Sequence, residues 1–93
     1  MALDEDIARG GEADQILRSA LFIAARKRVL EGIESQMRQV PLSDQTMHTR
    51  LILALQVWDQ FEKYFEQIKQ TGEIAQFQVR QEEERKKRWP VFS

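Results

Sequence analysis

The chain has 93 residues, of which 42% are hydrophobic and 31% charged, a balance typical of globular or coiled-coil proteins rather than disordered ones. Its net charge of −1 argues against a general electrostatic grip on nucleic acid, and the absence of cysteine excludes disulfides and thiolate zinc sites. The longest apolar runs, 20–25 and 51–55, are too short to span a bilayer, so we expect a single helical domain with no membrane-spanning segment.

Residues 1–11 predict a short opening helix or an acidic N-terminal arm. Asp4, Glu5 and Asp6 precede Gly10-Gly11, and each glycine weakens a helix by about 1 kcal/mol relative to alanine. We therefore expect a break at the glycine pair, followed by the first main helix. The acidic residues either dock on a basic partner or complement the positive end of a helix dipole. They are also the reverse of a signal peptide's basic start, which predicts a protein that is not secreted.

Residues 12–40 predict the first main helix, which carries apolar residues on two faces. One face holds Ala13, Ile16, Leu17, Ala20, Leu21 and Ala24, and the other holds Phe22, Ile23, Val29, Leu30, Ile33, Met37 and Val40. A helix with one neighbour needs only one apolar stripe. Two stripes indicate either two neighbouring helices, one of them from another chain, or a kink near Ala24-Ala25.

The segment Val40-Pro41-Leu42-Ser43-Asp44 predicts a tight turn. Proline disfavours helix at the preceding residue, so the helix ends by Val40. Either Ser43 or Asp44 then caps the next helix. So short a connection predicts an antiparallel helical hairpin.

Residues 44–88 predict a long second helix. Its apolar seam recurs at gaps of three and four through Met47, Leu51, Ala54, Trp58, Phe61, Phe65, Ile68, Gly72, Ala75 and Val79. The seam continues through Gly72, which predicts a continuous helix or one with a bend at that residue. Glu82, Glu83 and Glu84 each precede a cation by four residues, which supports an exposed helix end.

Residues 89–93, Trp-Pro-Val-Phe-Ser, predict an aromatic C-terminal tail after the proline stops the helix. The tail either folds back on its own hairpin or docks into a groove on a neighbouring subunit. If it docks, Trp89→Ala and Phe92→Ala should weaken assembly and leave helicity unchanged.

No arrangement of side chains predicts catalysis. His48 is the sole histidine, Gly10-Gly11 lacks the Gly-Lys-Ser/Thr continuation of a phosphate loop, and Glu31 and Glu34 have no acidic partner motif. An all-helical enzyme could use Arg18, Arg28 and Arg50, but no motif in the sequence supports that role. We predict no enzyme activity, no cofactor, no metal and no small-molecule substrate.

Two basic clusters, Arg26-Lys27-Arg28 and Arg85-Lys86-Lys87-Arg88, give the alternative function: a small helical nucleic-acid-binding oligomer, such as a packaging or regulatory subunit. Arg26, Lys27 and Arg28 are its candidate contact residues. Neither cluster lies on a recognisable helix-turn-helix, so we do not favour this alternative.

Four segments form a recognisable pattern: Gly11-x-Ala13 leading to Leu17 and Phe22, Pro41 with Asp44, Leu51 to Leu55, and Thr71-Gly72-x-Ile74-Ala75. Together they resemble small helical proteins of tailed bacteriophages and prophages, which are of unassigned function and encoded among virion structural proteins. The resemblance covers residues 7–79 and transfers no catalytic residues. It implies a virion or assembly component, located in the virion or the host cytoplasm.

The sequence therefore predicts an all-α hairpin that forms a homo-oligomer or docks on other virion proteins. A two-helix hairpin cannot shelter the apolar run 51–55, the aromatic rings of the second helix and both faces of the first. The predicted function is structural: a capsid-associated, head-to-tail or internal component. The predicted interface residues are Leu51, Leu55, Trp58, Phe61, Phe65, Ile68, Trp89 and Phe92.

Overall fold

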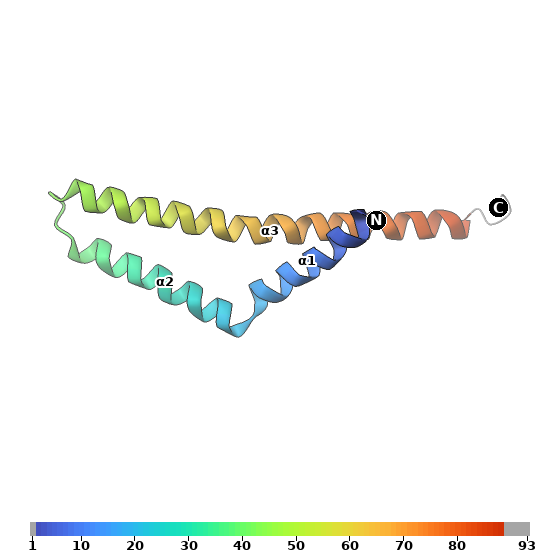
Figure 1. Cartoon of the computed structure of the whole chain (residues 1–93), viewed down its shortest axis with the longest axis horizontal. Coiled ribbons are helices and arrows are strands. Elements are labelled where there is room, and N and C mark those ends of the chain that lie inside the picture. The colour runs from blue at the N-terminus through green and yellow to red at the C-terminus, as the bar shows by residue number, and fades with distance from the viewer. Residues whose placement is uncertain (1, 89–93) are drawn as a thin grey trace. The chain divides into compact units, whose positions relative to one another are not determined.

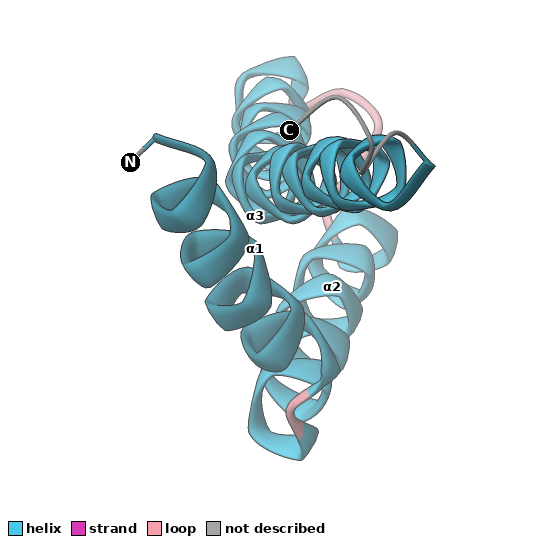
Figure 2. Cartoon of the chain, turned by 90° about the vertical axis from the view of Figure 1, so that its right-hand side faces the viewer, coloured by secondary structure: helices cyan, strands magenta, loops and turns pink. Residues whose placement is uncertain are grey.

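The computed structural model describes residues 2–88, and this part of the chain is helical with no strand. Its helices are α1 (Ala2–Arg18), α2 (Ala20–Gln39) and α3 (Gln45–Arg88) (Figure 1). In Figure 2 the pink segments are the two connections between them. The all-α fold class is confirmed, while the predicted tail with Trp89 and Phe92 lies outside the described residues.

The first connection is at Ser19, where the sequence predicted unbroken helix. Ser19 has extended backbone (φ −66°, ψ 141°), and its Oγ accepts a hydrogen bond of 3.0 Å from the backbone N–H of Phe22. A serine in this position caps α2 by satisfying one of its free N–H groups. The predicted helix 12–40 is therefore two helices, and the kink expected near Ala24-Ala25 is wrong because α2 is continuous there.

The break expected at Gly10-Gly11 is also wrong, because α1 is helical through both glycines. Residues 1–11 are accordingly not an arm apart from the first helix, since residues 2–11 belong to α1. The helical cost of glycine is offset at Gly10 by a close contact with another helix, described below.

The second connection, residues 40–44, forms the predicted turn. Val40 ends α2 with extended backbone, and the Asp44 carboxylate accepts a hydrogen bond of 3.1 Å from the backbone N–H of Met47. The imidazole Nε2 of His48 lies 3.2 Å from the carbonyl oxygen of Val40 and 3.1 Å from that of Pro41, so this nitrogen donates to the turn. His48 thus has a structural position, tying the start of α3 to the end of α2.

The chain forms two compact units, a finer division than the single domain that we expected. Residues 16–64, here called the hairpin unit, contain α2 and the first half of α3. The described residues of the other unit, 2–15 and 65–88, contain most of α1 and the second half of α3; we call this part the glycine unit.

In the hairpin unit, the covered face of α3 keeps Met47, Leu51 and Trp58 of the predicted seam and differs from it at two positions. Leu51 is buried, Leu55 and Trp58 are half-buried, and Glu62 follows on the same side of the helix. Ala54 and Phe61, which we had placed on the seam, are exposed. The gaps of three and four fit both sets of residues. Because Glu62 is charged, the sequence pattern did not assign it to the covered face of α3.

Glu62 and its neighbour Trp58 make three contacts on the covered face of α3. The indole N–H of Trp58 donates to Glu62, and Arg26 of α2 places its Nε 2.6 Å from the same Glu62 Oε1. The ring of Phe22 stacks on Trp58 with centroids 6.2 Å apart. A carboxylate with two donors is satisfied where an unpaired one would be costly to cover.

In the glycine unit, α1 and α3 meet backbone to backbone at Gly10 and Gly72. A methyl group on Gly10 would lie 2.7 Å from the Gly72 Cα, and one on Gly72 would lie 2.8 Å from the Gly10 Cα. Ala13 and Ala75, each one turn away, are buried at 3% and 2% exposure. Small residues permit this approach, as in other helix pairs with short interaxial distances. The helix α3 is continuous through Gly72. Gly72 therefore occupies a position of the apolar seam because it packs on α1, and it does not end the helix.

Candidate protein-interaction surface

Large apolar side chains are exposed mainly on the hairpin unit. Among the described residues, ten of the thirteen exposed large hydrophobics belong to this unit: Ile16, Leu21, Ile23, Val29, Leu42, Ile52, Leu53, Val57, Phe61 and Tyr64. The glycine unit contributes Leu3, Ile74 and Phe77. A soluble monomer exposes isolated apolar side chains but rarely so many on one small unit.

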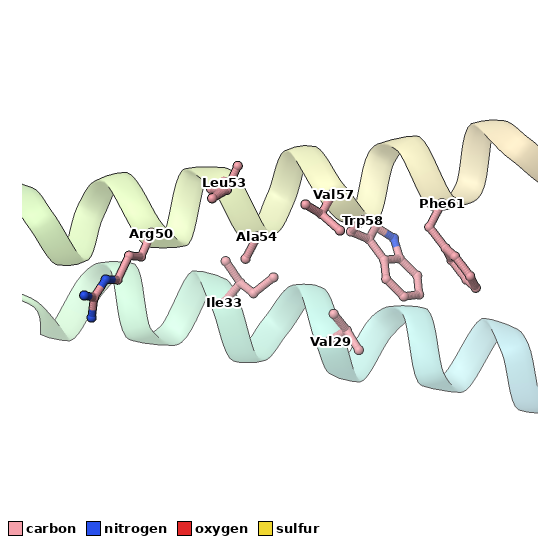
Figure 3. Close-up of a pocket in the computed structure, with 8 residues that line it drawn as sticks. All are labelled: Val29, Ile33, Arg50, Leu53, Ala54, Val57, Trp58 and Phe61. Carbon is pink, nitrogen blue, oxygen red and sulfur yellow. The ribbon is translucent and has the colours of Figure 1, made fainter.

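Several of these residues line a groove of about 590 Å³ between α2 and the first half of α3. Its walls are Val29 and Ile33 of α2 and Arg50, Leu53, Ala54, Val57, Trp58 and Phe61 of α3. Figure 3 shows Ile33 directed toward α3 and Trp58 directed toward α2. Arg50 is the one charged residue among these walls. Such a lining favours an apolar occupant, as in grooves that receive amphipathic helices.

The α3 wall of the groove belongs to a second apolar stripe on this helix. At 100° per residue, Leu53, Val57, Phe61 and Tyr64 fall within a sector of about 80°, and Arg50 falls in it too. Each of the four is between 49% and 61% exposed. The stripe lies beside the face that packs on α2, so α3 has one covered face and one uncovered face within the hairpin unit.

The described members of the predicted interface set have three different environments. Leu51, at 6% exposure, is core of the hairpin unit and already covered by its own chain. Leu55, Trp58, Phe65 and Ile68 are half-buried by intramolecular packing. Phe61 alone of the described members is both exposed and on the groove.

The predicted interface set does not contain Leu53, Val57 and Tyr64, although the all-round apolar run 51–55 was a signal. The stripe recurs at gaps of three, four, four and three from Arg50 to Tyr64, and the seam also recurs at gaps of three and four. Spacing alone therefore did not separate the two faces of α3.

The charges of the candidate nucleic-acid contacts are partly neutralised by carboxylates of the hairpin unit. Arg26 pairs with Glu62, and the Lys27 Nζ lies 4.0 Å from Glu31. Arg28 is exposed. Because two of the three cations face carboxylates, the positive potential available to a phosphate backbone is low here.

The other polar groupings described here also consist of pairs of oppositely charged side chains. Glu34 accepts from Arg38 at 2.6 Å on α2, and a hollow of about 290 Å³ in the glycine unit holds Lys69 with its Nζ 3.5 Å from Asp14. Along residues 2–88 no group of three or more potential metal ligands comes together. In that same range, none of the helices has both the length and the apolar content for crossing a membrane.

Comparisons of the chain with models of known protein families, with curated proteins and with solved structures found no match.

Proposed function

We propose that the chain is a non-enzymatic assembly protein whose hairpin unit packs against other protein chains in a bacteriophage particle. The observation that supports this most strongly is the apolar surface of the hairpin unit. That surface has the composition of a protein interface, and its groove holds one charged residue and no pair of convergent polar groups.

Covering apolar surface of this kind contributes about 25 cal/mol for each Å² removed from water. An interface of standard size can therefore outweigh the entropy lost when two chains associate. The structural role of the chain follows from this balance: it is stable as part of a larger assembly and presents an uncovered face on its own.

The bacteriophage particle is proposed as the assembly because of the resemblance of residues 7–79 to small helical phage proteins. Within it, a capsid-associated, head-to-tail or internal position would each provide protein neighbours at high local concentration.

Particle composition tests this proposal directly. In density-purified particles from a host that encodes the chain, quantitative mass spectrometry should find it at a fixed ratio to the major capsid protein. Leu53→Asp together with Val57→Asp should abolish incorporation, because two charges would enter the uncovered face. Gln56→Asp, an exposed neighbour outside the stripe, is the matched control and should incorporate normally. Absence of the wild-type chain from particles and from assembly intermediates would refute the proposal.

A further inference from the structure

We propose that the groove of the hairpin unit is covered by a second copy of this chain, with the two α3 helices antiparallel about a two-fold axis at Val57. This inference rests on the proposed function and names one partner for the same surface. The stripe on α3 and the positions of its one cation and its tyrosine carry it.

The stripe is symmetric about Val57. From Arg50 the residues of the stripe follow at gaps of three, four, four and three: Leu53, Val57, Phe61 and Tyr64. Reversing the direction of the helix leaves this pattern unchanged. Dimers with two-fold symmetry use the same patch on both copies, so a patch that matches its own reverse suits an antiparallel pair of helices.

The pairing places complementary side chains opposite one another. Val57 meets Val57 of the second copy on the axis, and Leu53 meets Phe61 of the second copy on either side of it. At each end, Arg50 meets Tyr64 of the second copy, where a guanidinium can lie on the aromatic face. All five residues are exposed in the single chain.

The charge of Arg50 selects the antiparallel arrangement over the parallel one. A parallel pair in register would oppose Arg50 to Arg50, and like charges at an interface core are repulsive. The antiparallel pair separates the two guanidinium groups by the length of the stripe. It also covers the apolar residues between them.

The groove gives the second copy a contact beyond the α3 stripe. Val29 and Ile33 line the other side of the groove, so the second copy would contact both helices of the hairpin unit.

Cysteine cross-linking tests the axis, since the natural chain has no cysteine. Val57→Cys should form a disulfide-linked dimer on mild oxidation, because a residue on a two-fold axis faces its own copy. Asp59→Cys is the matched control: it is exposed, two residues away and on the other side of α3. It should stay monomeric on denaturing gels. A dimer that cross-links at Asp59→Cys and not at Val57→Cys would overturn the arrangement.

A charge pair at the same position tests the self-pairing independently. Val57→Glu alone and Val57→Lys alone should each weaken self-association about 100-fold or more, because each puts like charges on the axis. Mixing the two variants should restore a dimer of one Glu and one Lys chain. Circular dichroism should show unchanged helicity in both, since Val57 is 58% exposed in the single chain.

Two outcomes would refute this inference: a wild-type chain that is monomeric at micromolar concentration, or a mixture that fails to restore the dimer. If the same chain is nevertheless incorporated into particles, the proposed function stands and another virion protein occupies the groove. If it is dimeric but absent from particles, the proposed function fails and the pairing stands.

Discussion

The two units of this chain bury their helices in opposite ways. In the glycine unit the backbones of α1 and α3 touch at Gly10 and Gly72, and Ala13 and Ala75 are almost fully covered. In the hairpin unit Leu51 is the one buried apolar residue, and large side chains elsewhere in this unit remain exposed. Small residues let two helices cover each other, whereas large ones on several faces need a further partner.

This difference separates self-contained packing from packing that needs another chain. In the glycine unit the two helices lie so close together that a Cβ at either glycine would collide with the facing backbone. The hairpin unit has a satisfied polar cluster at its centre, Glu62 with Trp58 and Arg26, and an apolar groove beside it. The comparison predicts that substitutions at the buried contacts of either unit change folding and that those on the groove change association.

The largest effect on folding is expected from Leu51→Ala. Leu51 is 6% exposed, so removing its side chain leaves a cavity and should lower the free energy of unfolding by about 2–3 kcal/mol. Leu53→Ala is the matched control, two residues along α3 and 56% exposed. It should weaken self-association and leave the stability of the dilute single chain nearly unchanged. Urea unfolding followed by circular dichroism at several protein concentrations would separate the two effects; equal losses at low concentration would contradict the assignment.

The next effect concerns the glycine contact. Gly72→Ala should destabilise the chain by about 1–3 kcal/mol, because its Cβ would lie 2.8 Å from the Gly10 Cα and 2.9 Å from the Asp6 carbonyl oxygen. The gain of about 1 kcal/mol in helix propensity only partly compensates.

Gly11→Ala provides the control, because nothing lies within 4 Å of the position that its Cβ would take. It should stabilise the chain by up to about 1 kcal/mol. Thermal unfolding of both variants measures the contrast. If Gly72→Ala and Gly11→Ala behave alike, α1 and α3 do not touch at this point.

A smaller effect is expected at the connection between α1 and α2. Ser19→Ala removes the oxygen that accepts from the Phe22 N–H and should cost about 1 kcal/mol. Ser19→Asp keeps a capping oxygen and should retain most of the stability. Nuclear magnetic resonance chemical shifts of residues 19–23 would report the loss of the cap; a Ser19→Ala chain with continuous helical shifts through 19 and unchanged stability would show that the serine is not the cap.

The sequence predicted those parts of the fold that depend on neighbouring residues. Pro41 ended the helix at Val40, and Asp44 capped the next helix, because both effects act over a few residues. The continuity of α3 through Gly72 followed from the unbroken apolar spacing.

The parts that it missed depend on residues far apart in the chain. Gly10 reads as a helix breaker until Gly72 is seen against it, 62 positions later. Glu62 reads as a surface charge until Trp58 and Arg26 are seen to donate to it. Part of the candidate surface was predictable from the sequence, since Phe61 was identified as an interface residue. Leu53 and Val57 were not identified, because the apolar residues around them lie on two faces of α3 that the sequence pattern did not separate.

The solution mass of the wild-type chain tests the central claim most directly, namely that the hairpin unit needs a second chain to cover its apolar face. Sedimentation equilibrium at micromolar concentration should give an oligomer, with a dimer at twice the chain mass of 11.0 kDa as the predicted species. A single species of 11.0 kDa across the concentration range, with no tendency to associate, would contradict the account.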